Sequence, residues 1–212
     1  ANTSEVDNYL GLPMINGFDM AMKFSEHVAN LGLTSIKESV VSLEKEGNLH
    51  RITTSSEVYL SKTVILATGA HPRKLGVKGE AEFNAAGVSY CAVCDGAFYR
   101  QKTVAVVGGG DVAVEDALYL SRLCKKVYLV HRRDALRAEK ISQELLFKAE
   151  NVEILWDSVV DEITGDVGVN GAVIRNVKTQ VTTQVPLDGI FIGIGTEANT
   201  SFLIGSDLLD QN

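Results

Sequence analysis

The sequence predicts an α/β fold with three layers, in which helices pack on a parallel sheet. Three consecutive segments carry this prediction. Residues 104–107 are an apolar run typical of a buried strand, residues 111–123 place small and apolar side chains at helical spacing, and residues 127–130 are a second strand-like run. Two strands joined through a helix in this order pair in parallel by a right-handed crossover. We therefore expect them at the centre of the main domain.

Further elements are expected on both sides of this unit. A helix should begin at Asn16-Gly17 and end at Gly32, because apolar residues recur between them at helical spacing. Residues 35–67 are typical of an antiparallel meander, closed by a continuous apolar strand at 63–67. Residues 72–86 mix Pro, Gly and charged residues without periodicity, which indicates a linker. The other predicted elements are a helix at 140–149 and strands at 152–156, 162–164, 173–178, 180–185 and 189–195.

Charge and composition restrict the kinds of partner. The 212 residues carry a formal net charge of -7, which argues against nucleic acid or an anionic membrane as the main partner. No apolar run approaches the ~20 residues of a membrane span, and no signal peptide is recognisable, so the cytoplasm is the expected location. Three cysteines fit an intracellular chain with one working pair and one bystander. Because the chain starts at Ala1 without an initiator Met, we expect a fragment of a longer protein.

A glycine-rich turn follows the first of the two central strands. Gly108, Gly110 and Ala113 occupy the positions of a dinucleotide-binding fingerprint that ends in alanine. The first glycine allows a tight turn, the second lets a pyrophosphate approach the backbone, and the small third residue lets the helix pack on the strand. Unpaired amides at the helix start would hold the phosphates. The motif is weak alone, but the flanking strand and helix supply its required context.

The second central strand ends in basic residues. An acidic residue there would bind the free 2′-hydroxyl of NAD, but the sequence has His131-Arg132-Arg133, and Arg137 follows one helical turn later. A cluster of guanidinium groups suits a dianionic 2′-phosphate, which favours NADPH over NADH. The alternative is a solvated basic helix start whose charge is partly neutralised by Asp134.

Cys91 and Cys94 form a dithiol pair just before the first central strand. Zinc would need two further thiolate or imidazole ligands, yet only Cys124 remains, on a stripe expected to be buried, and the four histidines are scattered. A pair at this spacing can instead close a small disulfide and activate one thiol for exchange. Asp95 could transfer the proton of that exchange, or it is an ordinary turn residue before Gly96. No metal is expected.

With these motifs the chain resembles the low-molecular-weight bacterial thioredoxin reductases. The Cys pair followed by Asp-Gly, together with His-Arg-Arg and a later Arg, is highly specific. The resemblance covers essentially the whole chain. Its segments are Thr3-Ser4-Glu5-Val6-Asp7-Asn8-Tyr9, Ala67-Thr68-Gly69-Ala70, Cys91-Ala92-Val93-Cys94-Asp95-Gly96, Gly108-Gly109-Gly110-Asp111-Val112-Ala113-Val114-Glu115, His131-Arg132-Arg133-Asp134, Arg137-Ala138-Glu139-Lys140 and Ile194-Gly195-Thr196-Glu197-Ala198-Asn199-Thr200.

The resemblance implies a flavoprotein with two dinucleotide-binding domains. Residues 1–72 and 189–212 would be a partial FAD-binding domain, and residues 73–188 an inserted, Rossmann-like NADPH-binding domain that carries the dithiol. Electrons would pass from NADPH through FAD to the Cys91/Cys94 disulfide and on to thioredoxin. The inserted domain would rotate about hinges at 72–86 and 188–189, and the enzyme would be a homodimer.

Roles for single residues also follow from the resemblance. Cys94 would be the thiol nearest the flavin, Cys91 the one that exchanges with thioredoxin, and Asp95 the acid or base. Asn8, Thr68 and Gly69 would face FAD, and Glu115 would lie near the nicotinamide. The complete set of expected cofactor-binding residues is Gly108, Gly110, Asp111, Val112, Ala113, Glu115, His131, Arg132, Arg133, Arg137, Ile194, Gly195, Asn8, Ala67, Thr68 and Gly69.

Departures from the family leave other functions open. The family begins with a strand and a glycine-rich turn for FAD and closes with a Gly-Asp segment that touches the flavin, and both are missing here. We therefore expect an incomplete FAD site and no activity of this chain alone. One rival is the flavoprotein component of an alkyl hydroperoxide reductase, which usually prefers NADH and lacks the arginine cluster. Another is an NADPH-binding or redox-sensing module without turnover.

Overall fold

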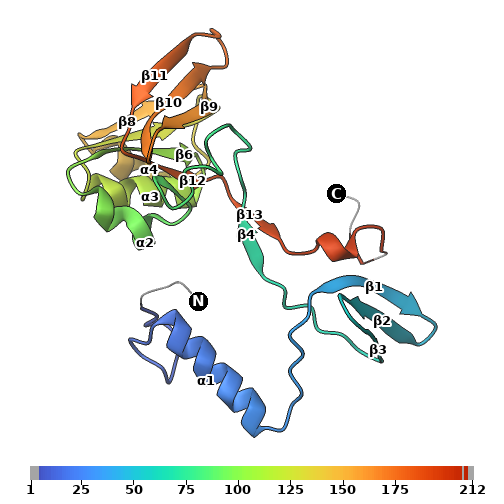
Figure 1. The fold of residues 1–212 in the computed structure, drawn as a ribbon. Coiled ribbons are helices and arrows are strands. Elements are labelled where there is room, and N and C mark those ends of the chain that lie inside the picture. The colour runs from blue at the N-terminus through green and yellow to red at the C-terminus, as the bar shows by residue number, and fades with distance from the viewer. Residues whose placement is uncertain (1–4, 207, 210–212) are drawn as a thin grey trace. The chain divides into compact units, whose positions relative to one another are not determined.

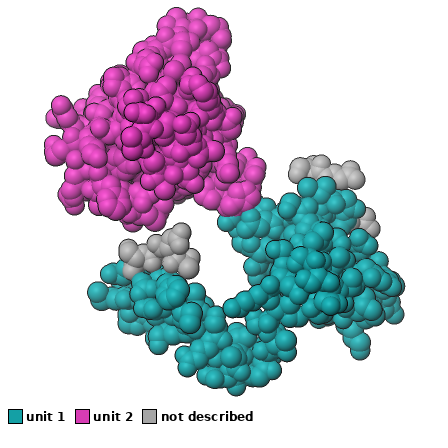
Figure 2. Space-filling model, viewed as in Figure 1, with its two compact units in different colours: residues 1–70, 198–212 teal, residues 71–197 magenta. Residues whose placement is uncertain are grey.

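The computed structural model describes residues 5–206 and 208–209. The chain divides into two compact units (Figure 2). Unit 1 spans residues 1–70 and 198–212, and unit 2 spans residues 71–197. Thr3 and Ser4, which begin the first segment of the resemblance, lie outside the described residues.

Unit 2 is built on a five-stranded parallel sheet (Figure 1). The predicted strand, helix and strand are present, and the two strands pair in parallel from Thr103 opposite Lys126 to Val107 opposite Val130. This arrangement confirms the Rossmann-like α/β fold. In spatial order the strands are β5 (Val88–Ser89), β12 (Gly189–Gly193), β6 (Thr103–Gly108), β7 (Lys126–Val130) and β8 (Val152–Leu155).

Two further layers cover the faces of this sheet. One face packs on helices α3 (Asp111–Ser121) and α4 (Lys140–Phe147). The other packs on an antiparallel sheet of β9 (Ser158–Gly165), β10 (Val169–Asn176) and β11 (Thr182–Pro186). Along β6 the buried side chains alternate, so that Val104 and Val106 face the helices, whereas Ala105 and Val107 face the antiparallel sheet. The predicted elements in this half of the chain are thus confirmed, with ends displaced by a few residues.

Asp116 on α3 lies in an environment that disfavours the ionised form of its carboxyl group. Burial, and secondly the nearby Glu115, raise its pKa from the ordinary value of 3.8 to about 6. The folded state therefore binds this proton more tightly than the unfolded state. The resulting stabilisation is complete below about pH 4 and is lost as the pH rises through about 6.

We expect Asp116→Asn to stabilise the protein above pH 6. The pKa difference corresponds to about 3 kcal/mol at full burial, and partial exposure of the side chain reduces the gain to roughly 1–2 kcal/mol. Urea unfolding of variant and parent at pH 4 and pH 7.5 measures it. The gain in the free energy of unfolding should be present at pH 7.5 and small at pH 4. At pH 7.5, Glu115→Gln should give a smaller gain than Asp116→Asn. An equal gain at both pH values would contradict this explanation.

Unit 1 contains α1 (Gly17–Asn30) and an antiparallel sheet of β1 (Val40–Glu46), β2 (Leu49–Thr54) and β3 (Val58–Ser61). Asn16 caps α1, because its side-chain oxygen accepts the N–H of Asp19 at 2.8 Å. The short helix η2 (Ser201–Leu203) lies against β1. The predicted helix and meander are confirmed. None of the helices in the described part of the chain is long and apolar enough to span a membrane.

The predicted strand at 63–67 is wrong. This segment has no strand partner among the described residues, and Ile65 is 92% exposed. A strand requires a neighbouring strand that forms hydrogen bonds with its backbone N–H and C=O groups. An apolar run is typical of a strand, but it does not show that such a neighbour exists. The meander of unit 1 therefore ends at β3.

The predicted linker at 72–86 is also wrong. Glu80 and Phe83 are buried, and Phe83 belongs to the core between the two sheets of unit 2. The carboxylate of Glu80 accepts hydrogen bonds from the N–H groups of Leu75 at 2.8 Å and Gly76 at 2.7 Å and from the hydroxyl of Tyr90 at 2.9 Å. The segment is irregular but packed, because this carboxylate satisfies backbone groups that a helix or strand would otherwise pair.

The predicted domain boundary at 188 has to be moved. β12 pairs with β6 over its whole length and thus belongs to unit 2. Asp188 itself is held there, because its N–H donates to the Thr103 carbonyl at 2.7 Å and its carboxylate accepts the Thr103 N–H at 2.8 Å. The chain instead passes between the units at β4 (Ala70–Pro72) and β13 (Thr196–Ala198), which pair with each other. The predicted hinge at 72–86 overlaps the first crossing only at Pro72, and the predicted hinge at 188–189 precedes the second crossing.

Candidate functional site

The glycine-rich turn closes β6 and opens α3. Gly108 has a φ of 150°, and a Cβ atom there would lie 2.4 Å from the Gly193 carbonyl oxygen and 2.6 Å from the Ala113 Cβ. Ala113 is fully buried, so the helix packs directly on the strands. Gly110 caps α3, and nothing lies within 4 Å of a Cβ built on it. The turn therefore presents open backbone to an incoming group, as a pyrophosphate requires.

A cavity of about 490 Å³ lies over this turn. It is entirely within unit 2. Its lining brings together most of the residues predicted to bind a cofactor, namely Gly108, Gly110, Asp111, Val112, His131, Arg132, Arg137, Ile194 and Gly195. Sequence reasoning missed Arg73, Leu75, Val77 and Val160, which also line it, because they come from the packed segment 72–86 and from β9. Volume and lining suit an extended phosphate-bearing ligand.

His131 supports the turn from inside the protein. Its side chain is 4% exposed, and its Nε2 donates to the Ala135 carbonyl at 2.9 Å. A Cβ on Gly109 would lie 2.1 Å from the imidazole ring, so the ring packs directly under the turn. Its edge-on contact with Trp156, at 6.2 Å between ring centroids, fixes its other side. The predicted cofactor residue His131 thus lines the cavity with a ring whose Nε2 is already engaged.

The arginine segment, residues 131–139, is fastened to the glycine-rich turn. The N–H of Arg137 donates to the Gly109 carbonyl at 2.7 Å, and the N–H of Glu139 donates to the Asp111 carboxylate at 2.7 Å. Arg132 and Arg137 both line the cavity. These two hydrogen bonds, both donated by backbone N–H groups, explain why the arginines that follow β7 lie beside the glycine-rich turn.

Arg133 does not line the cavity, and all three arginine side chains are exposed. None of them forms an ion pair or a side-chain hydrogen bond with another residue of the described chain. Asp134, the expected partial neutraliser, instead pairs with Lys178 at 3.1 Å, and this hydrogen bond lowers the pKa of Asp134. The three guanidinium groups are therefore available to an anion.

The predicted dithiol is present as a disulfide between Cys91 and Cys94, with Cα atoms 5.3 Å apart. It spans the start of α2 (Ala92–Asp95), which continues as η1 (Gly96–Tyr99). The N–H of Cys94 donates to Cys91 Sγ at 3.2 Å. In the described chain the Cys94 residue is exposed and Cys91 is half-buried. A backbone donor aimed at one sulfur favours negative charge on that sulfur when the bond is reduced.

Ser89 is a part of the site that sequence reasoning missed. It is 4% exposed, and its hydroxyl donates to Asp95 Oδ2 at 2.7 Å while accepting the N–H of Cys91 at 3.1 Å. One buried hydroxyl thus ties the carboxylate of Asp95 to the backbone of the first cysteine. A Ser two residues before a Cys pair, at a strand end, was the available signal, because a buried hydroxyl must find partners.

Cys124 is a core residue, as predicted. It is buried in the cluster between the helices and the sheet, and burial raises the pKa of its thiol to about 11. At neutral pH it is therefore a protonated and inaccessible thiol.

The residues expected to contact FAD do not form a common binding pocket in the described chain. Asn8 and residues 67–69 are all exposed, and no hydrogen bond joins these two segments within the described chain. Residues 68 and 69 instead bond with Asn199, whose side chain and backbone donate to the carbonyls of Thr68 and Gly69 at 2.9 and 3.0 Å. Glu115 is exposed on α3 and does not line the cavity.

Comparison with known proteins extends this picture. A sequence profile described as pyridine nucleotide-disulphide oxidoreductase matches residues 6–211. The thioredoxin reductases of Listeria monocytogenes and Streptomyces coelicolor are each 40% identical to the chain over 211 residues, which are 99% of this chain and 66% of either relative. The chain thus spans slightly less than two thirds of the length of these relatives.

Solved structures agree with the sequence relatives. The crystal structure of Lactococcus lactis thioredoxin reductase matches with a TM-score of 0.78 and 43% identity, covering 99% of this chain and 70% of that one. That of T. acidophilum thioredoxin reductase matches with a TM-score of 0.73 and 33% identity, covering 100% and 70%.

The fold and the site together define a class of protein. A parallel sheet with a dinucleotide-type glycine turn, and a disulfide held in the same unit, are the parts of an oxidoreductase that uses a pyridine nucleotide. The chain belongs to the pyridine nucleotide-disulphide oxidoreductase family.

Proposed function

We propose that this chain carries the NADPH site and the redox disulfide of a thioredoxin-disulfide reductase. One observation supports this more than any other. The cavity over the glycine-rich turn is edged by two unpaired guanidinium groups, and the same compact unit holds the Cys91–Cys94 disulfide. The sequence relatives and solved structures named above are thioredoxin reductases. The arginines count against the NADH-preferring hydroperoxide reductase component.

The net reaction consumes one NADPH and one proton for each disulfide reduced to two thiols. When bound, NADPH supplies the hydride, that is, the electron pair. FAD would accept that pair in the complete enzyme. The described residues do not by themselves enclose a flavin, so the roles assigned below concern only the nucleotide cavity and the disulfide. Gly110 gives the pyrophosphate access to the backbone, while Arg132 and Arg137 bind the 2′-phosphate.

Exchange with the partner then proceeds through the reduced cysteine pair. The Cys91 thiolate attacks one sulfur of the partner's disulfide, forming a mixed disulfide and releasing the partner's other sulfur as a thiolate. Cys94 next attacks the Cys91 sulfur, which restores the Cys91–Cys94 bond and releases the reduced partner. Asp95, oriented by Ser89, exchanges the protons that these steps need.

The surroundings of the disulfide suit a protein partner. Val93 in α2 is 69% exposed, and Phe98 in the adjoining η1 is 75% exposed. Apolar side chains next to an exchangeable disulfide offer contact area that a small disulfide would not need. We propose thioredoxin as this partner. The enzyme would act in the cytoplasm and would be a homodimer. Light scattering of the purified protein tests the dimer.

Replacing Arg132 and Arg137 together with Gln is expected to weaken NADPH binding strongly and to leave NADH binding nearly unchanged. A hydrogen bond to a charged group contributes about 1.5–3 kcal/mol, and only NADPH carries the 2′-phosphate that would make these bonds. Calorimetric titration of both nucleotides measures the effect. Arg133→Gln is the matched control. It should lose less NADPH affinity than the double variant, because Arg133 does not line the cavity. Equal losses for the two nucleotides would refute the 2′-phosphate site and with it the NADPH assignment.

A further inference from the structure

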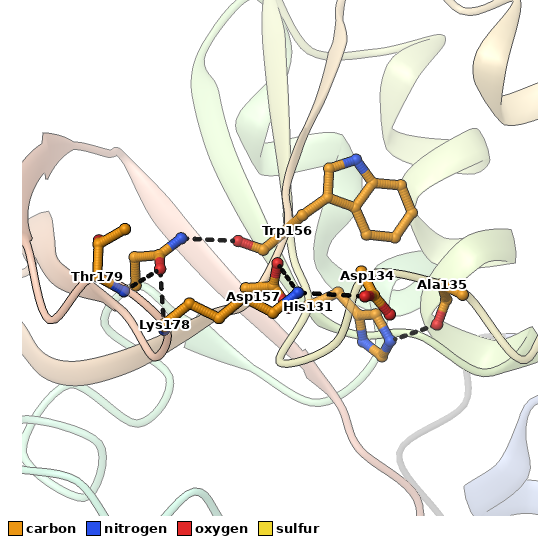
Figure 3. A network of polar contacts seen from close by, with 8 residues as sticks. His131, Asp134, Ala135, Trp156, Asp157, Lys178 and Thr179 are labelled. Carbon is orange, nitrogen blue, oxygen red and sulfur yellow. Dashed lines mark hydrogen bonds and ion pairs between the residues drawn. The ribbon is translucent and has the colours of Figure 1, made fainter.

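Lys178 contacts the arginine segment although it lies far from it in sequence (Figure 3). It belongs to the turn between β10 and β11, and its Nζ is 3.1 Å from Asp134 Oδ2 and 2.9 Å from Asp157 Oδ2. Asp134 comes directly after Arg133, whereas Asp157 follows β8 and its side chain is only 16% exposed. One ammonium group therefore holds two carboxylates, one in the arginine segment and one next to Ser158, which lines the cavity.

Backbone hydrogen bonds fix this arrangement. The N–H of Asp157 donates to the Arg133 carbonyl at 3.1 Å, and the Asp157 carbonyl accepts the N–H of Val177 at 2.6 Å. Asn176 Oδ1 accepts the N–H groups of Lys178 and Thr179 at 3.0 and 2.9 Å, which holds the turn in shape. The turn that carries Lys178 is thus joined through Asp157 to the arginine segment.

Lys178 and Asp134 each stabilise the charged form of the other. The hydrogen bonds that Lys178 donates to Asp157 and, secondly, to Asp134 raise the pKa of Lys178, and the hydrogen bond from Lys178 lowers the pKa of Asp134. The neighbouring arginines have no carboxylate partner within the described chain. Asp134 is the acidic residue nearest in sequence to Arg132 and Arg133, and it is paired with Lys178.

We propose that Lys178 determines specificity for the 2′-phosphate of NADPH by holding the carboxylates of Asp134 and Asp157 away from the guanidinium groups of Arg132 and Arg137. The inference rests on the proposed function. Without Lys178, two carboxylates would stand uncompensated beside a phosphate that carries nearly two negative charges, and Asp134 could pair with a guanidinium instead. NADH has no such phosphate, so its binding would change little. Lys178 is a positioning residue, because it lines none of the nucleotide cavity.

The test is calorimetric titration of NADPH and NADH with Lys178→Met, Lys178→Arg and the double variant Lys178→Met, Asp134→Asn. We expect Lys178→Met to weaken NADPH binding roughly three- to tenfold and NADH binding less than about twofold. The NADPH loss should shrink at high salt, because these charges are exposed. Lys178→Arg should keep the parent affinity, and the double variant should regain most of it.

Lys126→Met is the matched control. Lys126 forms an ion pair of similar length, 2.8 Å with Glu153, but at the start of β7 and thus at the end remote from the arginine segment. Its loss should leave both affinities unchanged. Asp134→Asn alone, in the parent, should not weaken NADPH binding, and this variant tests the idea even if Lys178→Met folds poorly.

Three results would overturn the inference alone: an unchanged NADPH affinity in Lys178→Met, equal losses for both nucleotides, or no recovery in the double variant. A parent chain that binds NADH as tightly as NADPH would overturn the proposed 2′-phosphate site as well. The two failures are therefore distinguishable from the parent titration.

Discussion

Cys94→Ser is expected to trap thioredoxin on Cys91 as a stable mixed disulfide. The Cys91 thiolate displaces thionitrobenzoate from a thioredoxin whose remaining active-site thiol carries that group, and no second sulfur is then present to release the partner. The backbone N–H at position 94 still donates to Cys91 Sγ, so the group that favours the thiolate survives the substitution. Non-reducing electrophoresis detects the adduct, and thionitrobenzoate absorbance gives its rate.

Cys91→Ser is the matched variant and decides between two readings of the structure. Exposure alone favours Cys94 as the attacking thiol, whereas the hydrogen bond to sulfur favours Cys91. Because a hydrogen bond to a charged group contributes about 1.5–3 kcal/mol, we expect Cys91 to react roughly tenfold faster or more. Faster adduct formation through Cys94 would reverse the assignment. A variant lacking both cysteines should form no adduct, since Cys124 is buried.

The parts of the fold that could be predicted are those whose signals are local. The segment from β6 to β7 contains two apolar runs, a glycine turn and a helical stripe within 28 residues, and each element borders the next in space. Arg132 and Arg137 follow directly after this segment and line the same cavity as Gly108 and Gly110, because the ends of neighbouring parallel strands share one edge of the sheet. Most of the candidate nucleotide site was therefore accessible from sequence.

The errors concern pairings between distant residues. β12 joins β6 across more than 80 positions, so nothing in its own sequence shows to which unit it belongs. The segment around Glu80 looks like a linker because its order depends on one buried carboxylate. Ser89 and Lys178 were missed for the same reason, since each acts through a contact that only the folded chain creates.

Gly108→Ala is expected to destabilise unit 2 strongly. The φ of 150° at this position is strained for any residue with a Cβ, and the added carbon would lie 2.4 Å from the Gly193 carbonyl oxygen, which belongs to the backbone of β12 and cannot move aside. Backbone strain of about 1–3 kcal/mol and overpacking of about 1–3 kcal/mol together predict a loss of roughly 2–6 kcal/mol in the free energy of unfolding. Urea unfolding followed by fluorescence of Trp156, the single tryptophan of the chain, reports on this unit.

Gly110→Ala, two residues later, separates the role of the turn in folding from its role in binding. Its φ of -95° suits alanine and nothing lies within 4 Å of the added carbon, so the stability should change by no more than about 1 kcal/mol, the usual effect at a helix N-cap. The same carbon would project into the open space that the cavity offers to the pyrophosphate, so NADPH binding should weaken although the protein stays folded. The two variants are therefore expected to differ in kind: Gly108→Ala loses stability, and Gly110→Ala loses affinity for both NADPH and NADH, since both carry the pyrophosphate. Unchanged nucleotide affinity in a folded Gly110→Ala protein would mean that the phosphates do not lie on this turn.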